Sequence, residues 1–573
     1  MMGYKLRRVN KQGRYAGVTH SLGGIMKRIF AAIMMLGGTA LAQAQPVITA
    51  GGVVNAASYA APGMPNGGIA QGSLFAVFGT GLGGAALQKV TAYPLTTTFA
   101  GTSMSVTVNG VTTKPFITYT TAGQVGALMA STTPVGTGTV TLTYNGQTSA
   151  PQPIQVVASS FGIFTTNAQG TGLGSITSQS FVSASSSFAA NPGEAFIIFG
   201  TGVGPTTGDE SGPGSGLKLG ALPVEVLVGG KSVQVYAYAR APQYSGLDQV
   251  AFAVPSDVTG CAVPVAVRIG AVTSNFVTLP IAASGRTCSD PVTNPPVVVG
   301  PGGTISVGSV DLSRTAGSID VPGYGSSNFS ADSGTGLFAR STTANYNATP
   351  NPLLISTYGS CTVFTFKGAA PSTAVPDSVL LDAGPSLSVN GPGGQKSIPK
   401  SQGSYFGQFA MSSSIPGVPS TPLYLTKGTY TVTGPGGADV GPFTASLNVP
   451  DPLIWTNSSG IKTVNRAAGQ LITWSSGDTN GNVYIIGFSL TGTTVDNLSG
   501  AEFICIERNS AGKFTIPSSV LQALPATTTS LKAVSLLGAL IVEGITVGTF
   551  KPSGLDQATI SSSSLTVNSV NYQ

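Results

Sequence analysis

Two stretches of the chain repeat one pattern 121 residues apart and point to the fold class. Residues 72–83 read Gly-Ser-Leu-Phe-Ala-Val-Phe-Gly-Thr-Gly-Leu-Gly, and residues 193–204 read Gly-Glu-Ala-Phe-Ile-Ile-Phe-Gly-Thr-Gly-Val-Gly. Each copy is an apolar strand that ends in a Gly-Thr-Gly turn, and repetition at a long fixed spacing indicates a duplicated unit. The match continues further along, because Gln-Val at 124–125 corresponds to Gln-Val at 249–250. The sequence therefore predicts tandem β-sandwich modules.

The composition favours an all-β fold over disorder. The 573 residues include 78 glycines and 38 prolines, yet 41% of them are hydrophobic. The apolar residues occur in short Val, Ile, Phe and Tyr runs between turn residues, which is typical of sandwiches and barrels. Asn-Gly pairs at 109–110 and 145–146 follow alternating strands and predict hairpins. Only Ser518–Leu524 is expected to be helical, and the apolar segment Leu531–Val542 is predicted to form buried, paired strands.

Shifts in composition divide the chain into five parts. Residues 284–303 are rich in proline, glycine and serine, which predicts an extended linker, and Pro-Asp-Pro at 450–452 suggests a break near residue 450. The predicted parts are an amino-terminal extension and signal peptide (1–45), β-sandwich repeat 1 (46–165), β-sandwich repeat 2 (166–283), the linker (284–303), and a β-rich carboxyl-terminal region (304–573) of one or two sandwiches.

An export signal is predicted over residues 26–44. Met26-Lys27-Arg28 forms a basic start, an apolar run follows from Ile29, and Ala42-Gln43-Ala44 fits the small-x-small cleavage rule. The apolar run is too short to span a bilayer. We therefore expect a secreted or cell-surface protein that has no membrane span after the signal is removed.

The positive charge of the chain is confined to this leader. Seven of the 26 lysines and arginines lie before residue 46, where there is no aspartate or glutamate, so 19 basic and 20 acidic residues remain beyond it. A nearly neutral chain carries no electrostatic signature of a nucleic-acid partner. We expect an extracellular protein or a glycan as the partner, and no cofactor.

Four cysteines, all beyond the leader, agree with export. Four cysteines allow three pairings. We favour Cys261–Cys288 and Cys361–Cys505, because Cys288 directly follows the predicted repeat 2 that holds Cys261, and Cys361 and Cys505 both lie in the carboxyl-terminal region.

Several motifs in order resemble the Solibacter-type C-terminal domain family, a group of uncharacterised modules in secreted acidobacterial proteins. They are Val54-Asn-Ala-Ala-Ser-Tyr59, the two Gly-Thr-Gly elements, Ala241-Pro-Gln-Tyr-Ser-Gly-Leu-Asp-Gln-Val250 with Val254-Pro255, and Ser274-Asn-Phe-Val-Thr-Leu279. The resemblance covers about residues 48–283. It implies immunoglobulin-like folding, and it brings no known reaction and no catalytic residue.

The sequence offers little for catalysis. Its single histidine, His20, lies in the predicted leader, so a Ser-His-Asp triad or a histidine-ligated metal is excluded from the remainder. Asp332-Ser-Gly334 and Asp382-Ala-Gly384 weakly match an aspartic-protease dyad but are expected to be turns. Ser397-Ile-Pro-Lys400 matches a Ser-x-x-Lys pattern, but Pro399 opposes the helix that this pattern needs. A hydrolase in the carboxyl-terminal half remains only a remote alternative.

Two acidic segments share some features with calcium loops, and one glycine-rich segment shares some with a phosphate loop. Asp478-Thr-Asn-Gly-Asn482 alternates oxygen ligands but lacks the following glutamate, so a hairpin turn is expected. Asp209-Glu210 lies in a Gly/Pro/Ser loop and could bind calcium weakly. Gly79-Thr-Gly-Leu-Gly83 lacks the lysine and the helix of a phosphate loop. We therefore predict no metal ligand.

Five aromatic residues are candidate ligand contacts, because tryptophan and tyrosine offer a flat apolar face and a polar tip. They are Trp455, Trp474, Tyr236, Tyr238 and Tyr244. Tyr236 and Tyr238, two residues apart in a predicted strand, should share one sheet face. Burial of these rings would favour a scaffold, and exposure would favour a carbohydrate-binding module.

The sequence thus predicts an exported, non-enzymatic protein of tandem immunoglobulin-like sandwiches with a structural or adhesive role. The alternative function is binding of extracellular polysaccharide. Fold analogy alone does not decide between these functions.

Overall fold

The computed structural model describes residues 45–214, 217–288, 303–321, 325–342, 357–367, 378–414, 420–492, 494, 498–528 and 537–573. Over these ranges the chain is nearly all β, which confirms the predicted class, and the one α-helix described there is α3 (Ser518–Leu521). No helix in the same ranges has the length and hydropathy to cross a membrane. The predicted signal peptide and most of the 284–303 linker lie outside the described residues.

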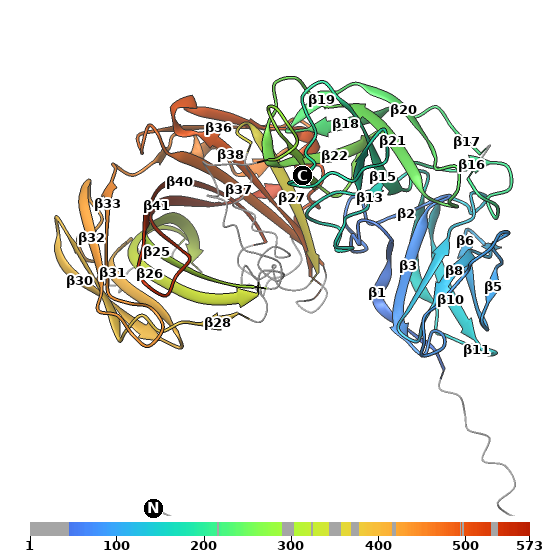
Figure 1. The fold of residues 1–573 in the computed structure, drawn as a ribbon, viewed down its shortest axis with the longest axis horizontal. Helices are drawn as coiled ribbons and strands as arrows, with labels where there is room; N and C mark the ends of the chain where they lie inside the picture. The colour runs from blue at the N-terminus through green and yellow to red at the C-terminus, as the bar shows by residue number, and fades with distance from the viewer. Residues whose placement is uncertain are drawn as a thin grey trace, which may run out of the picture. The chain divides into compact units, whose positions relative to one another are not determined.

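Repeat 1 is a sandwich of two sheets, drawn in blue in Figure 1. One sheet has the order β1-β3-β9-β8-β4: β1 (Val47–Asn55), β3 (Leu74–Thr80), β9 (Gln124–Leu128), β8 (Phe116–Thr120), β4 (Gln88–Lys89). The other has the order β2-β12-β10-β6-β5, with β11 and β7 paired at the side: β2 (Ile69–Ala70), β12 (Gln152–Val157), β10 (Gly136–Tyr144), β6 (Thr102–Val108), β5 (Thr98–Phe99), β11 (Gln147–Thr148), β7 (Val111–Thr113).

Repeat 2 is built in the same way and begins just before the predicted boundary at 166. Its first sheet holds β13 (Gly162–Ile163), β15 (Ala195–Thr201), β21 (Asp248–Ala253), β20 (Val235–Arg240) and β14 (Ile176–Ser178). Its second sheet holds β19 (Lys231–Val233), β18 (Val224–Val228), β22 (Gly260–Ile269), β23 (Val272–Thr273) and β24 (Val277–Ile281), and β16 (Thr206–Thr207) pairs with β17 (Lys218–Leu219).

The two repeats share strand register as well as sequence. Strand β3 pairs with β9 so that Phe78 faces Gln124, and β15 pairs with β21 so that Phe199 faces Gln249. The predicted correspondence between the Gln-Val pairs is therefore confirmed. The Asn-Gly hairpins are confirmed too, because both residues of each pair have positive φ and join β6 to β7 and β10 to β11 through two-residue turns.

The carboxyl-terminal region is dominated by one large sheet, whose long strands curve together in Figure 1. Its order is β27 (Ser360–Lys367), β38 (Ser499–Arg508), β37 (Asn482–Thr491), β40 (Gly538–Phe550), β41 (Gln557–Ser569), β25 (Thr304–Val321), β26 (Gly325–Thr342), β31 (Ser404–Ser413), β30 (Gly394–Ser401), β29 (Ser386–Gly391), β32 (Gly428–Gly434), β33 (Phe443–Val449), with β28 (Val379–Leu380) paired to β26. Shorter strands are β34 (Ile454–Trp455), β36 (Gln470–Ser475), β39 (Lys513–Ile516), β35 (Thr463–Val464) and β42 (Asn571–Tyr572).

Strands from both sides of residue 450 enter this sheet, and two hydrophobic cores pack against it. One core gathers around Phe338, Tyr405 and Tyr430, and the other around Phe503 and Tyr572. Residues 531–536 of the predicted apolar segment lie outside the described residues. From Gly538 on, the segment forms β40, paired between β37 and β41 as expected of a buried strand.

Candidate functional site at the junction of the repeats

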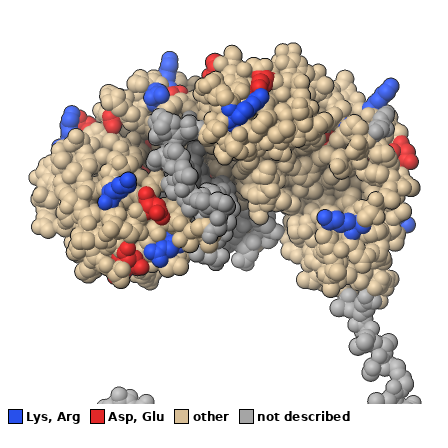
Figure 2. Space-filling view, viewed as in Figure 1, with Lys and Arg blue, Asp and Glu red and all other residues tan. Residues whose placement is uncertain are grey.

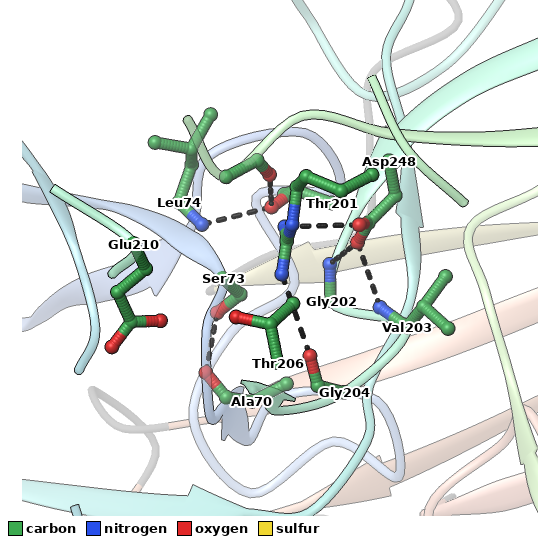
Figure 3. Close-up of polar contacts among 12 residues, drawn as sticks. Ala70, Ser73, Leu74, Thr201, Gly202, Val203, Gly204, Thr206, Glu210 and Asp248 are labelled. Carbon is green, nitrogen blue, oxygen red and sulfur yellow. Dashed lines mark hydrogen bonds and ion pairs between the residues drawn. The ribbon is translucent and has the colours of Figure 1, made fainter. Parts of the chain in front are cut away.

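The Gly-Thr-Gly turn of repeat 2 lies against repeat 1, and residues from Pro46 onward form one compact unit. The Thr201 hydroxyl accepts a hydrogen bond from the Leu74 N–H at 2.8 Å and donates one to the Gly246 carbonyl at 2.6 Å. Figure 3 shows the hydrogen bond between Leu74 and Thr201. Because Thr201 is fully buried, its hydroxyl satisfies backbone groups of both repeats inside the junction.

A buried ion pair lies beside this threonine. Arg240 Nη1 is 2.9 Å from Asp248 Oδ1, and both side chains are about 1% exposed or less. Asp248 Oδ2 also accepts the N–H groups of Gly202 and Val203 at 2.8 and 2.9 Å (Figure 3). Burial raises the pKa of Asp248 to about 6, whereas Arg240 and the two N–H groups act to lower it.

A glutamate and a serine make the second polar contact of the junction. The Glu210 carboxylate accepts the backbone N–H and the hydroxyl of Ser131, each at 2.6 Å, and the Thr206 N–H donates to the Ser131 hydroxyl at 3.0 Å. Asp209 instead accepts two hydrogen bonds from Ser211, which hold the pKa of its carboxyl below the usual range. Both carboxylates of Asp209-Glu210, considered above only as a weak calcium site, thus have partners within the chain.

Asn55 closes the junction at the end of β1. Its amide nitrogen donates to the carbonyls of Ser160 and Thr201 at 3.2 and 3.4 Å, and its amide oxygen accepts the N–H groups of Ala57 and Ser58. One side chain therefore ties a turn of repeat 1 to the connection that precedes β13 and to the end of β15 in repeat 2.

The contacts of the junction position the two sandwiches against each other. Its carboxylates are paired with a guanidinium, hydroxyls or backbone N–H groups. No cluster of three or more potential metal ligands occurs anywhere in the described part of the chain. The arrangement holds the two sandwiches together by a buried ion pair and by hydrogen bonds, of which those of Thr201 and Asp248 are buried and those between Glu210 and Ser131 are partly buried.

Neither of the two tryptophans named as candidate ligand contacts is exposed to a ligand. Trp455 and Trp474 are 4% and 5% exposed and face each other across β34 and β36. Their indole N–H groups donate to Asn457 Oδ1 and to the Asn509 carbonyl, each at 2.9 Å. A buried indole with a satisfied N–H is a core residue.

The three tyrosines named as candidate ligand contacts do not form one exposed surface. Tyr236 and Tyr244 are exposed, whereas the Tyr238 hydroxyl bonds the Leu222 N–H at 2.8 Å and its ring packs on the repeat 2 core. The expectation that Tyr236 and Tyr238 share a face is wrong, because the register of β20 shifts between Val235 and Ala237. A bulge adds one residue and breaks the alternation of faces.

The structure joins Cys261 to Cys288 and Cys361 to Cys505, the pairs favoured from the sequence, and leaves no free cysteine. Cys361 and Cys505 are cross-strand neighbours in β27 and β38. This disulfide therefore fastens the edge strand of the large sheet to its neighbour.

The aspartates of the motifs considered for catalysis or calcium binding form ion pairs or hydrogen bonds within the chain. The turn expected at Asp332-Ser-Gly334 is wrong, because these residues lie within β26 and pair with β25, where Asp332 forms an ion pair with Arg314. Asp382 forms an ion pair with Lys400, the lysine of the Ser-x-x-Lys pattern. Asp478 accepts the Asn480 N–H and the Thr546 hydroxyl, so a turn does form after Asp478. The expected hairpin is wrong, because β36 pairs with β34 and β39, whereas β37 pairs with β38 and β40.

Sequence reasoning located the junction motifs but missed the roles of Asn55, Thr201, Arg240 and Asp248. A usable signal was the occurrence of a strand-terminal arginine and an aspartate in a chain that is only 8% charged. Charged residues in such surroundings are buried only when they are paired.

A comparison with protein-family models finds no match, and neither does a comparison with curated proteins. Among solved structures, the full extracellular region of plexin A4, domains 1 to 10, is 10% identical (TM-score 0.16) over 82% of this chain and 29% of the plexin chain. The tetra-tandem repeat in the extending region of a large adhesion protein is 12% identical (TM-score 0.12) over 86% and 95%.

A third similar structure is the Bacteroides ovatus mixed-linkage glucan utilization locus protein SGBP-B in complex with a mixed-linkage heptasaccharide. It is 11% identical (TM-score 0.18) over 37% of this chain and 45% of that chain. The present chain thus spans less than half the length of the plexin and SGBP-B chains. These likenesses concern the fold alone.

Proposed function

We propose that this protein is a non-enzymatic scaffold of the cell surface or extracellular space, in which the paired repeats act as a stiff spacer with an adhesive or structural role. One observation supports the proposal: side chains hold the junction between the repeats, and its centre is the buried Arg240–Asp248 ion pair. A flexible linker would serve two independent binding modules, whereas a packed joint fixes the direction from one sandwich to the next.

Surface charge supports the same function. Charged side chains are few and scattered on the face in Figure 2, with both signs interspersed. Contact with a partner would therefore depend little on long-range electrostatic steering. We also propose that residues 48–283 belong to the Solibacter-type C-terminal domain family.

The test is a deletion strain of the producing organism. We expect surface protease treatment of intact wild-type cells to degrade the protein, and the deletion to weaken attachment to matrix or to neighbouring cells. Purified protein should release no product from esters, peptides or polysaccharides. A protein that is protected in intact cells, or that turns over any of these substrates, would contradict the proposal.

A further inference from the structure

A second feature of repeat 1 is a pocket of about 230 Å³ between strands β3, β9 and β8 and the segment that follows β13 at the start of repeat 2. Its lining includes three aromatic residues, Tyr59, Tyr119 and Phe164, and two threonines, Thr118 and Thr165. The Thr165 hydroxyl accepts the backbone N–H groups of Gln169 and Gly170. Engineered apolar cavities of about 150 Å³ hold a benzene molecule, so this pocket has room for one substituted ring.

The walls of the pocket are firmly placed. An added Cβ on Gly126 would lie 2.1 Å from the Tyr119 ring, so this ring lies directly on the glycine backbone. On the opposite side, an added Cβ on Gly170 would lie 2.4 Å from the Ser58 carbonyl, so the repeat 2 loop is pressed against the turn that carries Tyr59. The pocket is therefore preformed rather than opened by a ligand.

Two lining residues adopt a backbone conformation that is unfavourable for them. Tyr59 and Ala168 both have φ of 53°. Non-glycine residues in this region carry strain, and such strain concentrates at binding sites, where the surrounding structure maintains it. Both residues lie at the same pocket although they are 109 positions apart in the sequence.

The polar groups of the pocket are neutral and have spare hydrogen-bonding capacity. No charged side chain is among the described residues that line it. The Tyr119 hydroxyl accepts the Gln124 amide at 2.7 Å, which leaves its own proton to donate, and the Tyr59 hydroxyl has no hydrogen bond within the described ranges. Burial raises the pKa of both phenols, that of Tyr119 to about 12, so both stay protonated.

We propose that this pocket binds one neutral pyranose ring, as a free sugar or as the end of an extracellular glycan. A tyrosine face matches the apolar face of a sugar ring, and the surrounding hydroxyls match its hydroxyl groups. An anionic sugar would meet no cation, and a hydrocarbon would leave phenol groups without partners. The inference goes beyond the scaffold function and does not depend on it.

The test is saturation-transfer NMR and calorimetry on the full-length protein with the methyl pyranosides of glucose, galactose and mannose. Glucuronate and choline, an anionic and a cationic ligand, are measured for comparison. At least one neutral pyranoside should bind at roughly millimolar affinity or tighter. Tyr59→Phe and Tyr119→Phe should each weaken binding about 3–10-fold, the usual effect of one hydrogen bond. Tyr244→Phe, which alters an exposed tyrosine elsewhere, should not change it.

A filling substitution tests the location. Ala56→Leu should abolish binding by occupying the pocket, whereas Ala150→Leu, at an exposed alanine of the same repeat, should leave it intact. If Ala56→Leu fails to fold, the two tyrosine variants decide. Tighter binding of the polymer than of the free pyranoside would identify a glycan as the source. Absence of binding to every neutral pyranoside, a preference for choline or glucuronate, or equal binding by folded Ala56→Leu would overturn the proposal.

Discussion

Arg240 and Asp248 are the residues of the junction that most need a partner, because both are buried ionisable groups. Asp248 retains three partners, one guanidinium and two backbone N–H groups, and Arg240 lies against the backbone of repeat 1 near Gly72. A buried pair of this kind does not by itself raise stability, but removal of one partner leaves the other charge unpaired in a dry site.

We therefore expect Arg240→Ala to lower the free energy of unfolding by about 3–5 kcal/mol. The matched control is Lys231→Ala, which breaks the exposed Lys231–Asp257 pair and should have little effect, because water screens that pair. Urea unfolding followed by circular dichroism measures both. Equal losses in the two variants would show that the Arg240–Asp248 pair has no special role.

At the scale of elements, the turn between β2 and β3 explains how the repeats approach so closely. Gly72 has φ of 68°, and an added Cβ would lie 2.9 Å from Ser131 Oγ, 3.0 Å from Arg240 Nη2 and 3.0 Å from the Gly204 carbonyl. Glycine is thus required at this position both for its backbone conformation and for the absence of a side chain.

Gly72→Ala should therefore be more destabilising than a glycine substitution that affects φ alone. Gly110 has a similar φ of 79° with nothing within 4 Å of an added Cβ, so Gly110→Ala isolates the backbone cost of about 1–2 kcal/mol. We expect Gly72→Ala to cost a further 1–3 kcal/mol or so from overpacking, measured by urea unfolding. A Gly72→Ala loss no larger than that of Gly110→Ala would mean that the joint yields to the methyl group.

The large sheet contains an acidic pair that should make stability depend on pH. Burial first, and then the nearby Asp311, raise the pKa of Glu543 to about 7 from 4.5, although Ser563 bonds the carboxylate. Because the folded-state pKa is the higher one, the stabilising contribution is full below about 4.5 and is lost as the pH rises through about 7.

The free energy of unfolding should consequently fall between about pH 5 and about pH 8, and Glu543→Gln should flatten this fall, because glutamine does not titrate. Chemical denaturation at several pH values compares the two proteins. An identical slope in wild type and variant would show that Glu543 ionises normally.

At the scale of the whole molecule, the two disulfides cross-link residues that are far apart in the sequence. Their sequence separations are 27 and 144 residues, and in the chain-entropy model such loops are worth roughly 3 and 5 kcal/mol. Non-reducing peptide mapping should find Cys261 linked to Cys288 and Cys361 linked to Cys505, and reduction should lower the melting temperature. A peptide that joins Cys288 to Cys361 would refute these pairs.

The repeat, the two Asn-Gly hairpins and the all-β class could be predicted from the sequence, because they depend on local patterns. The favoured cysteine pairs came instead from the predicted division of the chain into domains. A two-residue alternation, an Asn-Gly turn or a recurring Gly-Thr-Gly is visible without knowledge of neighbours in space. The bulge in β20 was not predicted, because one extra residue in a strand depends on how its partner strand is placed.

Only the tertiary structure decided which side chains build the junction and the pocket, and that Trp455 and Trp474 belong to the core. Leu74 and Thr201 are 127 positions apart, and Ser131 and Glu210 are 79 apart. No local pattern encodes such pairings, because they depend on how one packed sandwich meets the next. For the same reason a tryptophan in a strand has the same sequence signature whether its face is covered or open, and burial is set only when the sheets and the segments covering them are packed together.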